Sequence, residues 1–151
     1  MIAVDTNILV HAHRSELPEH ENALRWLTYL AQGSSPWGIP VFCLGEFLRV
    51  VTHTKILKPP SSLEESLLAL EGLLEAPTLQ VLSPGPRYPE LLAEVVRSAD
   101  ARGNLVFDAQ IAALCREQGI ARVLTLDRDF DRFPGIEKVS LKIEPGDELL
   151  G

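Results

Sequence analysis

The chain has 151 residues, 46% of them hydrophobic and 23% charged, which suits a folded domain and excludes disordered and fibrous proteins. A formal net charge of −7 argues against a protein that binds nucleic acid through a broad basic face. The two cysteines, Cys43 and Cys115, are too few for a disulfide scaffold and lack metal-ligand spacing, so we expect both thiols to be buried.

The first half of the chain alternates short apolar runs with longer helical patterns. An Asp-Thr-Asn sequence after the first apolar run can cap a helix, Pro18 can start the next helix, and Gly33 can end it. The predicted elements are a strand at 2–4, helices at about 6–13 and 18–32, a strand at 37–39 and a buried helix at 41–54.

The second half continues this alternation. Ser62 and Glu65 fit a capping box at the start of a leucine-rich helix, and Gly119 can stop a later one. The predicted elements are helices at 63–74, 88–101 and 106–118, strands at 78–82 and 122–126, and at most one edge strand after residue 135.

Short apolar strands between helices predict a mostly parallel central sheet with helices on both faces, a three-layer α/β/α sandwich. No repeat or long linker divides the sequence, so we expect one domain over residues 1–151. The N-terminus reaches a carboxylate too early for a signal peptide, and no apolar run approaches the roughly 18 residues of a membrane helix. We therefore expect a cytoplasmic protein with no membrane partner.

Two aspartates follow predicted strands. Asp5 comes directly after the first strand, and Asp127 comes directly after the strand at 122–126. If these strands are parallel neighbours, both carboxylates emerge at the same edge of the sheet, where open α/β sheets bind ligands. Capping of the following helix is the structural alternative for each residue taken alone.

Glu46 lies in a largely apolar stretch, where an unpaired carboxylate costs several kcal/mol. It either binds a metal or forms an ion pair with Arg49 on the same helix face. Asp108 opens a helix, and the helix dipole alone can explain an acid there. Asp100 competes with Asp108, but it lacks the following Ala-x-Ile-Ala-Ala run.

A cluster of these four acids makes chemical sense as a site for hard divalent cations. Mg²⁺ and Mn²⁺ prefer oxygen ligands, and carboxylates packed together repel one another without metal. Bound ions can activate water and stabilise the leaving oxygen in phosphodiester hydrolysis. The histidines show no convincing zinc spacing, and surface or helix-end roles suit them better: His11, His13, His20 and His53.

Four motifs occur in a fixed order along the chain. They are Val4-Asp-Thr-Asn7, Glu46 in an apolar helix, Asn104-Leu-Val-Phe-Asp108-Ala-Gln-Ile-Ala-Ala113, and Thr125-Leu-Asp-Arg-Asp-Phe130. Together they resemble the PIN-domain nucleases, and among these the VapC-type toxins of toxin–antitoxin pairs. The resemblance extends from Asp5 to about Pro134.

The resemblance implies a Mg²⁺- or Mn²⁺-dependent endoribonuclease with one or two ions per site, an RNA substrate, a homodimer and a protein antitoxin. The residues that match the family's metal-binding acids are Asp5, Glu46, Asp108 and Asp127. Asn7 and Thr125 match polar residues that orient those acids, and Asp129 matches an accessory acid. Asp127, Asp129 and Asp131 all compete for the fourth place, and Asp127 is preferred because it is nearest to the strand end.

Other functions remain open from the sequence. A housekeeping RNA-processing nuclease is the nearest alternative, and a non-catalytic binding module with the same fold is another. A haloacid-dehalogenase-like phosphohydrolase expects a second aspartate where Asn7 stands, and a receiver domain needs a phospho-acceptor aspartate after a central strand. The candidate phosphate contacts at the rim of the site are Arg14, Arg49, Lys55, Lys58, Arg102 and Arg128.

Overall fold

The computed structural model describes residues 1–147, so the last four residues of the predicted 1–151 domain lie outside the described part. The strands are β1 (Ile2–Val4), β2 (Trp37–Pro40), β3 (Leu79–Leu82), β4 (Arg122–Leu124) and β5 (Glu137–Val139). The α-helices are α1 (Thr6–His13), α2 (His20–Gln32), α3 (Val41–Thr52), α4 (Leu63–Leu74), α5 (Tyr88–Ala99) and α6 (Leu105–Gln118). A 3₁₀ helix, η1 (Arg128–Arg132), follows β4.

The five strands form one sheet in the order β3-β2-β1-β4-β5, and every neighbouring pair is parallel. The predicted parallel sheet is therefore confirmed, and β5 is the edge strand expected after residue 135. β1 pairs directly with β4, with Val4 opposite Leu124. This register places the carboxyl ends of the two strands side by side.

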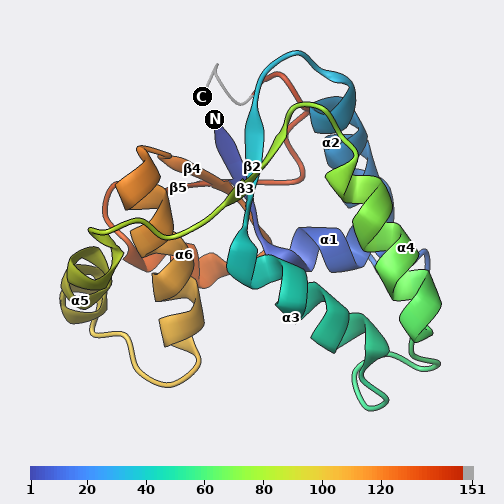
Figure 1. Cartoon of the computed structure of the whole chain (residues 1–151), viewed down its shortest axis with the longest axis horizontal. Coiled ribbons are helices and arrows are strands. Elements are labelled where there is room, and N and C mark those ends of the chain that lie inside the picture. Colours follow the sequence, from blue (N-terminus) through green and yellow to red (C-terminus); the bar gives the residue numbers. More distant parts are fainter. Residues whose placement is uncertain (148–151) are drawn as a thin grey trace.

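Helices cover both faces of the sheet, as the predicted three-layer sandwich requires. Figure 1 shows α5 and α6 on one side of the strands and α1 to α4 on the other. The strand residues of β1 and β2 are all buried, which explains why these short apolar runs form the centre of the sheet. The largest fully buried side chains of the core include Trp26, Trp37, Phe130, Ile8, Ile39 and Leu114.

The ends of the helices show local causes. Asp5 caps α1 by accepting a hydrogen bond from the Thr6 amide, and Ser62 caps α4 by accepting one from the Glu65 amide. Helix α5 ends at Ala99, two residues earlier than predicted, because Asp100 adopts a left-handed conformation with φ 47°.

The prediction that α3 is a buried helix is wrong. Its buried side chains are Cys43, Phe47 and Val51, and the side chain of Glu46 is 38% exposed. Helix α3 is thus amphipathic, with one face in the core and another open to solvent. Both cysteines are free and buried, as expected.

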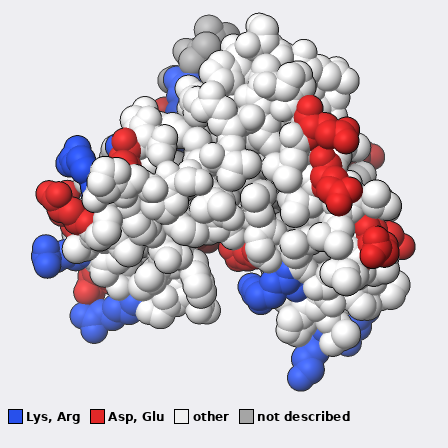
Figure 2. Space-filling view, viewed as in Figure 1, with Lys and Arg blue, Asp and Glu red and all other residues white. Residues whose placement is uncertain are grey.

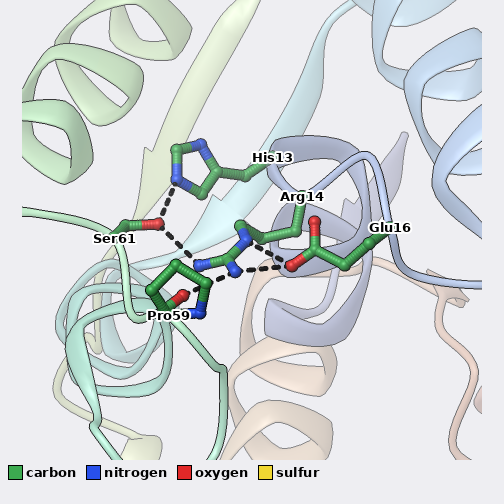
Figure 3. Close-up of polar contacts among 5 residues, drawn as sticks. All are labelled: His13, Arg14, Glu16, Pro59 and Ser61. Carbon is green, nitrogen blue, oxygen red and sulfur yellow. Dashed lines mark hydrogen bonds and ion pairs between the residues drawn. The ribbon is translucent and has the colours of Figure 1, made fainter.

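A polar clasp joins the end of α1 to the loop before α4 (Figure 3). The hydroxyl of Ser61, a buried residue, lies 2.9 Å from Nε2 of His13 and accepts a hydrogen bond from the Arg14 guanidinium at 3.2 Å. The same guanidinium donates to the Pro59 carbonyl at 2.6 Å and to Glu16 at 2.7 Å. Arg14 is therefore a structural residue, and its expected phosphate contact is not supported.

Within residues 1–147, no helix combines the length and the apolar character needed to span a membrane.

Candidate active site

The predicted acidic residues lie at the carboxyl edge of the sheet, each brought there by a different element. Asp5 follows β1 directly, and its backbone amide still donates to the Leu124 carbonyl of β4. Asp127 lies three residues beyond the end of β4, at the start of η1. Helix α3 begins immediately after β2 and carries Glu46, and α6 carries Asp108 in its first turn.

Asp5 is the most constrained of these acids. It is 5% exposed, and its two carboxylate oxygens accept hydrogen bonds from the Thr6 amide (2.7 Å) and the Thr125 hydroxyl (2.8 Å). Asn7 donates its side-chain amide to Asp5 at 3.4 Å and to Thr125 at 3.2 Å, and its amide oxygen accepts from the Leu126 backbone. Asn7 and Thr125 thus fix the orientation of the Asp5 carboxylate.

Burial raises the pKa of Asp5 to about 6. Hydrogen bonds from Thr125 and Thr6 oppose this effect, and the negative charges of Glu46 and Asp127 add to it. The carboxylate therefore lies in an environment that disfavours its charge.

Three aspartates come together beside it. One carboxylate oxygen from each of Asp108, Asp127 and Asp129 lies within 4.8 Å of the other two, the spacing expected around a shared cation. The Asp127 carboxylate also accepts from the Asp129 amide at 2.8 Å, which holds both residues on the turn of η1. Asp127 and Asp129 both face Asp108, so the cluster includes the predicted fourth acid and its accessory acid together.

Burial also raises the pKa of Asp108, to about 8. A hydrogen bond shared with Asp127 is the second cause, followed by the negative charges of Asp127, Asp5 and Asp129. Like charges at this range disfavour simultaneous ionisation unless a cation neutralises them.

Glu46 reaches the same site from the α3 side, although neither it nor Asp5 is among the three acids with metal-ligand spacing in residues 1–147. It accepts a hydrogen bond from the Thr6 hydroxyl at 3.2 Å, and the Arg49 guanidinium lies 4.0 Å from its other oxygen. Glu46 also lines, with Asp5, Asp108 and Asp127, a pocket of about 210 Å³. The ion pair with Arg49 is at the limit of its range, and metal binding by Glu46 stays a prediction.

The competing acids lie elsewhere. Asp100 caps α5, and its carboxylate lies 3.0 Å from the Arg102 guanidinium. Asp131 pairs with Lys138 at 3.7 Å. Within residues 1–147, the aspartate cluster is the one group with metal-binding spacing, and it contains no histidine. The four histidine rings form hydrogen bonds near helix ends, at His11, His13, His20 and His53.

The pocket opens into a larger groove of about 890 Å³ between two helix faces. Most residues of each wall share one helix face, and Leu105 and Gln110 of α6 also line the groove. The α3 stripe is Phe42, Gly45, Glu46 and Arg49, and the α6 stripe is Asn104, Phe107, Asp108 and Ile111. Figure 2 shows this hollow between two arms, with acidic side chains at its apex and basic side chains on one wall and at the arm tips.

Phe107 is a groove residue that the sequence reasoning missed. It lines both the acidic pocket and the groove, and its side chain is 61% exposed. Helical phase gave no signal for it, because Ile111 and Leu114 lie on the same face of α6 as Phe107 and are buried.

A family model described as PIN domain matches residues 2–136. The chain belongs to the PIN domain family. Its curated relatives place this PIN domain among the VapC proteins. VapC ribonuclease Mb2897 of Mycobacterium bovis is 38% identical over 133 residues, which are 88% of this chain and 90% of the relative. Ribonuclease VapC25 of Mycobacterium tuberculosis is 34% identical over 139 residues, 92% of this chain and 97% of the relative.

Solved structures share the fold of this PIN domain. VapBC2 from Rickettsia felis, bound to a DNA fragment from its promoter, superposes with a TM-score of 0.67 at 21% identity, covering 93% of this chain and 98% of that one. VapC20 of Mycobacterium tuberculosis, a sarcin-ricin loop cleaving toxin, gives a TM-score of 0.65 at 20% identity, covering 90% of this chain and 98% of that one. The family match leaves the haloacid-dehalogenase and receiver alternatives without support.

Proposed function

We propose that this PIN domain is a divalent-metal-dependent endoribonuclease and the toxin of a toxin–antitoxin pair. The observation that carries the proposal is the gathering of carboxylates at one sheet edge, where burial and mutual repulsion raise the pKa of Asp5 to about 6 and of Asp108 to about 8. A cluster with this electrostatic cost suits cation binding better than stabilisation of the fold. Relatives named as ribonucleases, at 31% to 38% identity, support the activity.

The donor set fits Mg²⁺ or Mn²⁺. The groups at the site are carboxylates and hydroxyls with no thiol or imidazole in the metal-spaced cluster of the described chain, and hard cations prefer such oxygens. The residues proposed to hold the cation are Asp5, Glu46, Asp108 and Asp127, with Asp129 as an additional acid. A bound divalent cation lowers the pKa of water and stabilises negative charge on a phosphate.

The remaining residues have positioning roles in this proposal. Thr125 and Asn7 hold Asp5 with its oxygens in a fixed direction, and Thr6 holds Glu46. Such outer contacts would keep the carboxylates oriented for a cation. Arg49, at the groove side of Glu46, is suited to contact a phosphate of the substrate.

The toxin role implies two protein contacts, an antitoxin and a second copy of this chain. Structural neighbours that include VapBC complexes support the antitoxin, and the size of the match to stand-alone VapC proteins supports the toxin role.

A metal-titrated cleavage assay on total cellular RNA tests the activity. The metal-free protein should leave RNA intact, and added Mg²⁺ or Mn²⁺ should produce discrete fragments. Asp108→Asn should reduce cleavage by roughly 100-fold or more, because it removes a carboxylate ligand while preserving side-chain size. Circular dichroism checks that the variant is folded.

Asp131→Asn is the matched control, since Asp131 lies on η1 with Asp129 but pairs with Lys138 outside the cluster. Equal cleavage by wild type and Asp108→Asn, at matched purity, would contradict the proposed metal site. Induced expression in cells tests the toxin role, because harmless accumulation of the intact protein without a partner argues for a housekeeping nuclease.

A further inference from the structure

An aromatic ring stands next to the acidic cluster. A single exposed apolar side chain is ordinary on a protein surface, but Phe107 precedes Asp108 directly and lines both the acidic pocket and the groove. Among the exposed large hydrophobic side chains of residues 1–147, it is the one that lines either space. The position of Phe107 beside the acids, rather than its exposure alone, suggests that its side chain has a role at the site.

The α3 wall of the same groove has open space at Gly45. Gly45 lies inside α3, where glycine destabilises a helix relative to alanine, and a Cβ built at Gly45 meets nothing within 4 Å. Packing therefore does not require glycine at this position. Because Gly45 lines the groove and has no side chain, the groove has open space on the α3 wall at this position.

We propose that the groove binds single-stranded RNA with one base stacked on Phe107, in the space that Gly45 leaves open. The proposal rests on the ribonuclease function proposed above and names how that site holds its substrate. Unpaired bases stack readily on aromatic side chains, and any base offers a face for this contact. The stacked nucleotide would lie beside the acids, which places its phosphate near Asp108.

The surroundings of Phe107 favour RNA over a protein partner. The groove lining is mixed: Phe42, Leu105 and Ile111 are apolar but only partly exposed or buried, while most of the other side chains are polar or charged. Exposed apolar side chains gather elsewhere, on α4, where Leu63 is 63% and Leu68 is 65% exposed. An exposed aromatic ring in a groove that also holds an arginine and a carboxylate cluster suits a nucleotide, which has a flat base and a charged phosphate.

Abasic substitution tests the stacking contact. In a short single-stranded RNA that the wild type cuts, each nucleotide is replaced in turn by an abasic ribose. Phe107→Ala should raise KM on the intact RNA by roughly 5- to 150-fold, and Phe107→Tyr should restore it. At one position near the cut, the abasic RNA should be cleaved equally well by wild type and Phe107→Ala.

Leu24→Ala, on the exposed part of α2, is the control for removal of an apolar side chain and should not change KM. The stacking proposal is wrong if Phe107→Ala cleaves intact RNA as wild type does. It is also wrong if the substitution raises KM by the same factor on every abasic RNA. Absence of any RNA cleavage by the wild type would instead contradict the ribonuclease function.

Fluorescence tests stacking without cleavage. Trp26 and Trp37 are fully buried, so the emission of an exposed tryptophan introduced by Phe107→Trp is separable from theirs. In an Asp5→Asn background with Mg²⁺, a short oligoadenylate should quench this emission saturably. RNA binding by anisotropy without quenching would overturn the proposal.

Substitution of Gly45 tests the α3 wall. Gly45→Ala has room for its methyl group and should cleave RNA within about twofold of wild type, while the helix becomes more stable. Gly45→Leu should fold but lose at least tenfold in kcat/KM, because its side chain enters the space for the base. Full activity of Gly45→Leu would contradict this part of the proposal.

Discussion

Thr125 connects three parts of the acidic site through one hydroxyl group. Its hydroxyl donates to the Asp5 carboxylate at 2.8 Å and accepts from the Asn7 side chain at 3.2 Å and the Asp127 amide at 3.0 Å. The residue is 2% exposed, so water does not replace these contacts without rearrangement. One small side chain thus fixes an acid from β1 relative to an acid that follows β4.

Thr125→Ala should reduce RNA cleavage by roughly 10- to 100-fold, the usual effect of losing a residue that orients a metal ligand. The Thr125 hydrogen bond lowers the pKa of Asp5, so its removal should also move the acid limb of the pH–rate profile to higher pH. Thr125→Ser keeps the hydroxyl and should restore both rate and profile. A loss of rate with an unchanged profile would contradict this positioning role.

The carboxyl groups also predict how pH affects the stability of the metal-free protein. Burial, with smaller contributions from neighbouring acids, raises the pKa of Asp5 from 3.8 to about 6 and that of Asp108 from 3.8 to about 8. Groups whose pKa is higher in the folded state stabilise it at low pH, and this stabilisation is lost as pH rises through the folded pKa. Stability without metal should therefore fall between pH values of about 4 and 8.

The measurement is the midpoint of thermal unfolding in a chelator at several pH values. His11 and His13, whose pKa values burial lowers, act in the opposite direction, so Asp108→Asn is compared with wild type at each pH. The variant should be more stable than wild type above pH 8, and Mg²⁺ should remove most of the wild-type loss. A metal-free stability difference that does not change with pH would be inconsistent with these pKa shifts.

At the scale of elements, the clasp of Figure 3 holds the end of α1 against the loop that leads from α3 to α4. Ser61→Ala should lower the free energy of unfolding by about 1 to 3 kcal/mol, because it leaves polar atoms of His13 and Arg14 without their buried partner. For a chain of this size the midpoint of thermal unfolding should fall by several degrees.

Ser34→Ala, at an exposed position between α2 and β2, provides the comparison and should change stability by less than about 0.5 kcal/mol. Equal midpoints for the two variants would show that the clasp does not stabilise the fold.

The elements differ in how far the sequence predicted them. The strands at β1 and β4 were predictable because short apolar runs end at polar residues, and their parallel pairing then placed Asp5 near the start of η1. Helix η1 was not predicted, since it depends on the Asp127 side chain accepting from the Asp129 amide and on burial of Phe130. Those contacts depend on where β4 lies in the sheet, so the local sequence does not predict them.

The candidate site was partly predictable for the same reason. Motif order placed the four acids, but the exposure of Glu46 depends on which face of α3 packs in the core. The groove forms between α3 and α6, which are distant in the chain. The sequence therefore did not indicate that Gly45 and Phe107 line the same groove.

At the scale of the whole molecule, the net charge of −7 limits how strongly the protein attracts RNA. Figure 1 places the loop after α3 and the loop before α6 on the two arms, and Figure 2 shows basic side chains at the tips of these arms. Lys55, Lys58 and Arg102 belong to these loops and are exposed. The basic groups therefore lie where RNA would enter the groove.

Replacement of Lys55 and Lys58 by glutamine should weaken RNA binding and reduce its dependence on salt. Each phosphate contact with single-stranded RNA contributes about 0.7 to the slope of log affinity against log salt, so the slope should fall by up to about 1.4. Anisotropy of a labelled oligonucleotide at several KCl concentrations measures this. Lys142→Gln, beside the contact between Trp26 and Ile143, should leave the slope unchanged, and an equal change there would indicate a nonspecific charge effect.

The all-parallel sheet has a practical consequence for experiments. Because every strand runs the same way, the loops that lead into β2, β4 and β5 lie at the edge opposite the acids, separated from them by strands roughly 10 Å long. The segment 33–36 is an exposed turn at that far edge. A fluorophore or affinity peptide attached there would follow this protein through binding and cleavage without entering the groove.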